Sequence, residues 1–215
     1  IPDLTYEQFL DFHRKYYHPS NSYIYLYGDM DMEEKLNWLD EKYLSDFDEI
    51  EVDSEIKYQK PFSQMQEIVQ EYSIASDESE ADNTYLSYNK VIGTSLDEKL
   101  YLAFQILDYA LLSAPGAPLK KALLDAGIGK DIMGSYDKGV YHPIFSVISK
   151  NANMEQKEAF VEVIENTLRN IAEGGIDKKA LQAGLNYYEF RFREADFGSY
   201  PRGLTYGLQL FDSWL

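Results

Sequence analysis

The 215-residue chain is expected to be an α+β protein with a mostly antiparallel sheet and helices packed on it. Three observations predict this class. Hydrophobic residues make up 45% of the chain and aromatic residues 15%, which is enough for a substantial core. Strand-like and helix-like segments follow one another without the strict alternation that a parallel sheet requires. Two alternating segments between residues 131 and 151 are joined by a short turn, which is typical of a hairpin.

The first element is predicted to be a helix that begins at Thr5. Thr5 and Gln8 have the spacing of a capping box, in which two side chains satisfy the free amide groups at the start of a helix. The helix is expected to end before Pro19, because the residue that precedes a proline is pushed out of the α region.

Residues 22–28 are predicted to form a strand inside a sheet. Tyr alternates with Ile and Leu over this segment, so neither face is polar, and such strands are covered on both sides. Asp31 with Glu34 then predicts the start of a second helix. The apolar seam of that helix is Met32, Leu36, Leu39 and Tyr43.

Four segments lead to the centre of the chain. Residues 46–61 are charged and lack periodicity, which is typical of a connecting loop. Residues 65–74 alternate loosely and predict a half-exposed strand. The acidic run 76–83 is expected to be a solvated turn, and residues 84–92 to be the strand that returns from it.

The next helix is predicted to run from a cap at Ser95, with Glu98 three residues later, to about Leu112. Its apolar residues surround it, so it is expected to be a buried core helix. Pro118 suits the first position of a short helix that follows.

Residues 131–137 and 141–151 are predicted to pair as a hairpin about residues 138–140, with the second arm inside the sheet. Two capped helices follow, with caps at Asn153 and Asp177. Their seams are Phe160, Ile164, Leu168 and Ile171 in the first, and Leu181, Leu185, Tyr188 and Phe192 in the second. A last helical pattern is Leu204, Leu208, Phe211 and Leu215.

Composition excludes several classes of function. The net charge of −17 argues against nucleic acid, which a binder meets with clustered Lys and Arg. The same charge favours basic peptides as partners, or it serves solubility alone. The chain has no cysteine and no apolar run of the length that a membrane span needs. Because it opens without methionine or a signal-peptide pattern and stops within a helical pattern, we expect an excised fragment.

Three segments carry a family resemblance. They are residues 12–36 (FHRKYYHPSNSYIYLYGDMDMEEKL), residues 114–129 (APGAPLKKALLDAGIG) and residues 199–215 (SYPRGLTYGLQLFDSWL). In this order the chain resembles the pitrilysin/insulinase-type zinc metallopeptidases, in their presequence-protease branch. The resemblance covers the second domain of the amino-terminal half of such an enzyme.

The resemblance implies an α+β half-module that does not carry the catalytic metal. Residues 1–197 are expected to be the non-catalytic domain, and residues 198–215 the start of the helical linker between the halves. Zinc is expected in the full-length parent and none on this fragment. The implied partners are peptide substrates, the missing catalytic domain and the second half of the same chain, without nucleic acid or membrane. A cytoplasmic location is the default, or the mitochondrial matrix if the source is eukaryotic.

No catalytic residue and no metal ligand is assigned to this fragment. The family's zinc site is a helical His-x-x-Glu-His, in which two histidines on one helix face bind the metal. The three histidines here are His13, His18 and His142, and none is part of that pattern. His13 and His18 are five residues apart with Pro19 directly after, so they do not share a helix face.

The remaining candidates for chemistry are carboxylates and tyrosines. Four carboxylates of the acidic run, at Asp77, Glu78, Glu80 and Asp82, are expected to be solvated, whereas a working acid needs burial or a close partner. Tyr136 and Tyr141 flank the hairpin turn and are the candidate substrate-binding residues, because tyrosine stacks on a peptide and hydrogen-bonds to it. Their ordinary alternative role is packing, and an exposed hairpin arm could instead pair with an extended peptide.

Two functional hypotheses follow. The first is a chamber-forming domain of a zinc endopeptidase that hydrolyses short unfolded peptides, inactive on its own. The second is an inactive homologue that serves as a binding or assembly subunit. A His-x-x-Glu-His motif upstream of this segment would distinguish them.

Overall fold

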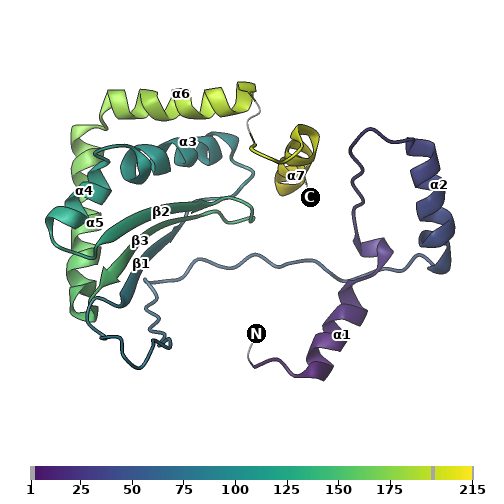
Figure 1. Cartoon of the computed structure of the whole chain (residues 1–215), viewed down its shortest axis with the longest axis horizontal. Helices are drawn as coiled ribbons and strands as arrows, with labels where there is room; N and C mark the ends of the chain where they lie inside the picture. The colour runs from purple at the N-terminus through teal and green to yellow at the C-terminus, as the bar shows by residue number, and fades with distance from the viewer. Residues whose placement is uncertain (1–2, 195–196, 215) are drawn as a thin grey trace. The chain divides into compact units, whose positions relative to one another are not determined.

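The computed structural model describes residues 3–194 and 197–214 (Figure 1). The chain divides into two compact units, Ile1–Glu71 and Tyr72–Leu215, called here the amino-terminal and the carboxy-terminal unit. Within the described residues, no helix is both long and apolar enough to cross a membrane. The predicted seam position Leu215 lies outside the described residues.

The amino-terminal unit contains two helices, α1 (Tyr6–Tyr16) and α2 (Met32–Lys42). The capping box predicted at the start of α1 is confirmed, since Thr5 and Gln8 exchange both side-chain bonds. The carboxylate of Asp31 accepts the amide hydrogen of Glu34 at 3.0 Å, which confirms the start of α2. Neither helix contains a buried residue, so local hydrogen bonds rather than a core define both.

The strand predicted at residues 22–28 is wrong for this structure. These residues form no strand in the structure, and the side chains of Tyr23, Ile24 and Tyr27 are exposed. A 3-10 turn, Pro19–Asn21, precedes residues 22–28. The backbone of residues 22–28 pairs with none of the three strands of the sheet. An apolar, alternating sequence favours a strand, but ladder hydrogen bonds from a neighbour are what stabilise one.

The strand predicted at residues 65–74 is also wrong. The segment is extended without ladder pairing, and Met65 and Ile68 are 68% and 87% exposed. Loose alternation over ten residues supplies neither a partner strand nor a surface on which to pack, so the prediction fails for the same physical reason.

The carboxy-terminal unit is built on a three-stranded antiparallel sheet of β1 (Thr84–Val91), β2 (Asp131–Asp137) and β3 (Ile144–Ala152) in the order β1-β3-β2. Both pairings are antiparallel. This confirms the α+β class, the returning strand and the hairpin. The second arm of the hairpin is the central strand, as its apolar residues on both faces predict.

One face of the sheet carries the core. Leu86, Ile132 and Val147 point to this face from the three strands and are 5% exposed or less. Helices α3 (Glu98–Asp108) and α4 (Pro118–Asp125) contact β2, and α5 (Lys157–Gly174) contacts β1 and α4. Helix α6 (Lys178–Glu194) lies on α3 as an outer layer (Figure 1).

The opposite face of the sheet is open. Tyr85 and Val91 are each 55% exposed there, and Ser87 and Asn89 are exposed between them. The side chain of Asn89 accepts hydrogen bonds from the hydroxyls of Ser87, at 3.1 Å, and Ser146, at 2.7 Å. The open face therefore mixes polar and apolar side chains, since Ile148 of the central strand and Met133 of β2 lie on it in register with Ser87.

Helix α3 differs from the prediction in two ways. Its cap is Asp97, whose carboxylate accepts the amide hydrogen of Leu100, while the predicted cap Ser95 instead donates its amide hydrogen to the carbonyl of Tyr141. Gln105 is its one buried residue. The buried apolar groups lie in the π-helical turn Tyr109–Ser113 that follows, so a helix apolar on all sides is buried here only at its end.

Helices α4 and α5 follow the predicted pattern more closely, whereas Leu185 and Phe192 of the seam predicted for α6 are each 42% exposed. Pro118 is the first residue of α4, and Phe160 and Ile164 of the α5 seam are at most 1% exposed. Gly175 ends α5 with a φ of +84°, a value that favours glycine. Helix α7 (Arg202–Trp214) completes the described chain.

Candidate functional site

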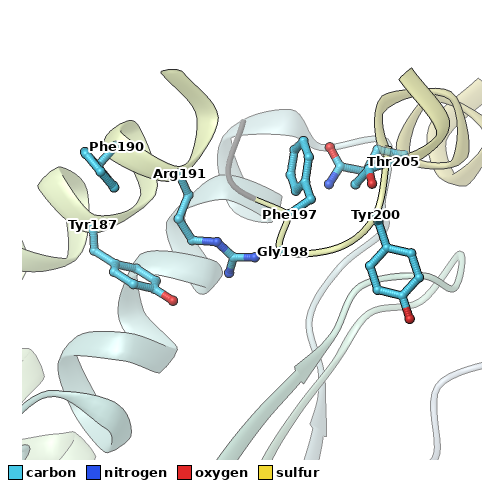
Figure 2. Close-up of a pocket in the computed structure, with 8 residues that line it drawn as sticks. Tyr187, Phe190, Arg191, Phe197, Gly198, Tyr200 and Thr205 are labelled. Atoms are coloured by element: carbon cyan, nitrogen blue, oxygen red, sulfur yellow. The ribbon is translucent and has the colours of Figure 1, made fainter. Parts of the chain in front are cut away.

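A pocket of about 600 Å³ lies between α6 and α7 in the carboxy-terminal unit (Figure 2). Its size lies within the usual range for small-ligand pockets, about 300–1,000 Å³. Aromatic rings dominate its wall, together with one guanidinium and two uncharged polar side chains. The lining residues are Tyr187, Phe190, Arg191, Phe197, Gly198, Tyr200, Thr205 and Gln209.

The α6 side of the pocket follows from helical spacing. Tyr187, Phe190 and Arg191 are three and four residues apart, so they share one face of the helix. The ring of Tyr187 is anchored from below by stacking on Tyr109, with centroids 5.0 Å apart and an interplanar angle of 13°. Helix α6 approaches α3 at the buried Gly184, where an added Cβ would lie 3.1 Å from Ile106. The position of Tyr187 in the pocket wall is therefore fixed by the packing of α6 on α3 and on Tyr109.

On the α7 side, Tyr206 makes one contact with α6 and one with the segment that precedes α7. The hydroxyl of Tyr206 donates a hydrogen bond to the carbonyl of Phe192 at 3.1 Å. The same ring meets Phe197 edge-on, with centroids 5.2 Å apart. Gly198 adopts a φ of +64°, so the chain turns sharply at the rim of the pocket.

The cation of the pocket is Arg191. Figure 2 shows its side chain extending from α6 towards Gly198, beside the ring of Tyr187. Its guanidinium carbon lies 5.8 Å from the centre of that ring, within cation–π range. Two residues further on, Arg193 pairs with Glu189 at 2.7 Å, whereas Arg191 forms no ion pair with any residue that the structure describes.

A second hollow, of about 540 Å³, lies in the amino-terminal unit and includes His13 and His18. The ring of His13 stacks on Tyr17 with centroids 4.6 Å apart, and Nδ1 of His18 accepts the amide hydrogen of Ser20 at 3.2 Å. Both imidazoles thus have structural partners. In residues 3–194 and 197–214, no group of three or more His, Cys, Asp or Glu side chains is placed to hold a metal ion.

The two candidate substrate-binding tyrosines occupy different environments. Tyr136 packs under α3 against Phe104, with centroids 5.8 Å apart, and its hydroxyl is buried without a hydrogen-bond partner. Tyr141 is half-buried beyond the end of β2 and meets the ring of His142 edge-on. The structure does not bring the two side chains into the pocket between α6 and α7. Their role as substrate contacts stays a prediction.

The acidic run is not simply solvated, because Asp82 is tied to the connection between β3 and α5. Its amide hydrogen is donated to Oδ1 of Asn153 at 2.8 Å, and its carboxylate accepts from Nδ2 of Asn153 and from Nζ of Lys130. The hydrogen bond from Lys130, followed by that from Asn153, lowers the pKa of Asp82. Asp82 also has a φ of +60°, so the turn is held in a conformation uncommon for a side chain with a Cβ.

A second carboxylate, Asp108, lies where α3 passes into the π-helical turn. Its Oδ1 is buried without a hydrogen-bond partner, and burial raises the pKa of this carboxyl group. A Cβ at Gly134 on β2 would lie 2.5 Å from that oxygen. Burial, and then the charge of Asp108, raise the pKa of the Tyr188 phenol. Asp108 does not line the pocket between α6 and α7.

The sequence reasoning did not find the pocket between α6 and α7. Its two walls come from separate helices, and their contact is set by Tyr206 and Phe197. The available signal was the spacing of Tyr187, Phe190 and Arg191, which places a cation between two rings on one helix face.

Comparison with known proteins gives one family. Residues 3–188 match the family described as the peptidase M16 inactive domain. The chain is 49% identical over 215 residues to a protein named HypA from Clostridium perfringens, and 37% identical over 219 residues to presequence protease 1, chloroplastic/mitochondrial, from Arabidopsis thaliana. All of this chain is covered in both cases, but only 22% and 20% of the relatives, so it spans about a fifth of their length.

A solved structure supports the same fold. The crystal structure of a protease from Helicobacter pylori matches 99% of this chain and 50% of its own, with a TM-score of 0.63 at 14% sequence identity. At this identity the match describes the fold alone, which agrees with the α+β architecture predicted from the sequence.

Proposed function

Because this chain belongs to the peptidase M16 inactive-domain family, and is thus a non-catalytic domain, we propose that it forms part of the wall of a peptidase chamber. The parent enzyme would be a zinc-dependent endopeptidase that hydrolyses short unfolded peptides. The Arabidopsis relative is named as a presequence protease, and this chain aligns with a fifth of its length.

The observation that carries the proposal is the one-sided sheet. Helices α3, α4 and α5 cover the face that bears Ile132 and Val147. The other face is open and presents Ser87 and Asn89 with Tyr85. A sheet that is packed on one side and open on the other suits the inner wall of a chamber. There an extended peptide would meet hydroxyl, amide and aromatic groups beside the apolar side chains of Ile148 and Met133.

The zinc would be held outside this chain. His13 and His18 stand on either side of a helix end, each with a structural partner, and no metal-binding group is present in the described part of the chain. These residues do not fit a metallopeptidase centre, so no catalytic step is assigned to them. The catalytic domain and the second half of the parent are the proposed partners of this domain in the same polypeptide.

The net charge of −17 would attract basic peptides towards the chamber through long-range electrostatics. We place the domain boundary at residues 197 and 198, with α7 as the start of the helical linker between the halves. The proposed location is the cytoplasm, or the mitochondrial matrix if the source is eukaryotic, in keeping with relatives such as the mitochondrial presequence protease of Xenopus laevis.

The first experiment compares the full-length protein with the 215-residue chain. We expect stoichiometric zinc and peptide hydrolysis in the full-length protein and neither in the 215-residue chain. Metal analysis and turnover of a fluorogenic peptide measure both quantities. Hydrolysis by the 215-residue chain would contradict the proposal.

The second experiment tests the wall directly. The chain has no cysteine, so Ser87→Cys introduces a single thiol on the open face, and Gln182→Cys on the exposed side of α6 is the matched control. Both are made in a full-length protein from which other cysteines have been removed. A short peptide with a bromoacetyl group should alkylate the thiol of Ser87→Cys at least about tenfold faster than that of the control. Equal rates would exclude the open face as a peptide-facing wall.

The alternative is a homologue that retains the fold for assembly or binding without hydrolysis. The sequence upstream of this chain decides between the two, because only the enzyme requires His-x-x-Glu-His there.

A further inference from the structure

We propose that the pocket between α6 and α7 binds the free carboxy-terminal end of a short peptide whose last side chain is apolar. The nature of this ligand rests on the proposed function, since a peptidase chamber holds peptide ends both before and after hydrolysis. The pocket itself rests on the geometry of α6, α7 and the lining residues Phe197, Gly198 and Tyr200 that precede α7.

The carboxylate is assigned to Arg191. This side chain lines the pocket and forms no ion pair with any described residue, although the chain has 37 acidic residues against 20 Lys and Arg. Arg193, on the same helix, is already paired with Glu189. A guanidinium presents parallel N–H donors that match the two oxygens of a carboxylate, so an arginine that forms no ion pair with a described residue complements an anionic group.

The apolar side chain is assigned to the rings. Phe190, Phe197 and Tyr200 line the pocket together with Tyr187, whose ring lies beside the guanidinium. A carboxylate on Arg191 would therefore lie next to an aromatic surface. A carboxy-terminal residue carries its carboxylate and its side chain on the same Cα, so one residue can satisfy both surfaces.

The polar side chains of the pocket suit the last peptide bond. Thr205 and Gln209 are half-buried on α7 and line the same pocket. The hydroxyl of Thr205 donates to the carbonyl of Pro201 at 3.4 Å and retains lone pairs that accept. The amide of Gln209 offers both a donor and an acceptor, which is what a peptide group requires.

An acidic side chain could also offer a carboxylate. In Asp or Glu, however, the carboxylate terminates the side chain, so an apolar group at the same position would have to come from a neighbouring residue. The geometry of a ring wall directly beside the guanidinium favours the chain end, and the experiment separates the two sources.

The test is a binding measurement on the full-length protein by fluorescence polarisation. Three amino-terminally labelled hexapeptides are used, with internal bonds N-methylated so that they are not hydrolysed. The first ends in Phe with a free carboxylate, the second is its carboxy-terminal amide, and the third is an amide with Glu in place of the last Phe. We expect the first to bind at least about tenfold more tightly than the other two.

The matched variants are Arg191→Gln and Arg193→Gln, which remove one charge each from α6, and circular dichroism verifies that both are folded. Arg191→Gln should weaken binding of the free-acid peptide about tenfold and leave the amide peptide within twofold, whereas Arg193→Gln should leave both within twofold. Equal binding of acid and amide, or equal effects of the two variants, would overturn the proposal. Tight binding of the Glu peptide would overturn the assignment to a chain end.

These outcomes are independent of the proposed function. Zinc content and peptide hydrolysis are measured on the same preparation, so an active enzyme with no preference for the free acid refutes the pocket alone. An inactive protein that binds the free acid through Arg191 refutes the peptidase and retains the pocket.

Discussion

The two units of this chain are built by different means. In the amino-terminal unit, α1 and α2 are well capped but contain no buried residue. In the carboxy-terminal unit, a single cluster of buried side chains joins the sheet to α4, α5 and the π-helical turn. All the buried hydrophobic residues of the described chain, from Leu86 to Ile164, belong to this second unit.

This difference separates what local sequence signals determine, the ends of helices, from what they do not determine, the stability of those helices. A cap or a proline specifies where a helix begins or ends, and it does so equally well in both units. Most of the stability of a helix in a protein comes from packing of an apolar face, which only the carboxy-terminal unit provides within itself. We therefore expect matched substitutions in the two units to have unequal effects.

The largest expected difference concerns two phenylalanines on helices. Phe160 of α5 is 1% exposed, and Phe9 of α1 is 60% exposed. Phe160→Ala should lower the free energy of unfolding of the 215-residue chain by about 3–5 kcal/mol, because it leaves a cavity in the core. Phe9→Ala should change it by less than about 0.5 kcal/mol. Urea unfolding followed by circular dichroism measures both.

A large effect of Phe9→Ala in the same experiment would contradict the comparison, since it would require a core in the amino-terminal unit that the structure does not contain. A small effect of Phe160→Ala would contradict the core assigned to the sheet.

The second prediction concerns close packing of β2 on the helix layer. A Cβ at Gly134 would lie 2.5 Å from Oδ1 of Asp108 and 2.6 Å from Cδ1 of Leu112. Gly134→Ala should therefore cost about 1–3 kcal/mol of unfolding free energy, as overpacking does. Gly174→Ala is the control, because nothing lies within 4 Å of its added Cβ, and its effect should be neutral or stabilising. Thermal unfolding of the two variants tests this, and equal losses would show that the contact relaxes freely.

The same contrast explains which predictions from the sequence succeeded. The capping box at Thr5, the helix start at Pro118 and the presence of a hairpin were predicted because each signal lies within a few residues of the feature it specifies. The connection in the hairpin is longer than predicted, because Asp137 pairs with Ile144 and residues 138–143 join the two strands. The strand at residues 22–28 was predicted from an equally clear local pattern and is absent, because a strand depends on a partner that its own residues do not encode.

Long-range contacts account for the remaining misses. The tie between Asp82 and Asn153 joins residues 71 positions apart, so the acidic run looked like a solvated turn in the sequence. The pocket between α6 and α7 depends on how two helices meet, whereas the rings and the cation on α6 follow from spacing alone.

The third prediction compares two helix caps. Asn153 donates and accepts hydrogen bonds with Asp82, and its amide hydrogen is donated to Oε1 of Gln156 at 2.9 Å. Asn153→Ala should lower the free energy of global unfolding by about 1–2 kcal/mol, because both hydrogen bonds between its side chain and Asp82 are lost. Thr5→Ala removes a cap on a helix without a core, so its effect should be confined to α1. Amide hydrogen exchange distinguishes a global loss of stability from a loss confined to α1. If Thr5→Ala reduced the protection of amides in the sheet, the expectation of a local effect would be wrong.

The smallest expected effect is a pH dependence from Asp108. Burial raises the pKa of its carboxyl group in the folded protein. The proton is therefore bound more tightly in the folded state, and the stabilisation from the neutral acid is complete below the unfolded pKa and lost as the pH rises through the folded pKa. The groups that face Asp108 are Tyr188 on α6 and Gly134 on β2, and neither supplies a positive charge.

Asp108→Asn should remove this dependence, so the difference in unfolding free energy between the variant and the natural chain should increase as the pH rises above the unfolded pKa of an aspartate. The gain should stay below about 1 kcal/mol, because the carboxylate is partly open to water. Asp40→Asn, at an exposed position on α2, is the control for the loss of one acidic group. Urea unfolding at a series of pH values measures both curves. A gain for Asp108→Asn that shrinks as the pH rises would mean that the folded protein stabilises the charged carboxylate, which would contradict the burial of its Oδ1 without a partner.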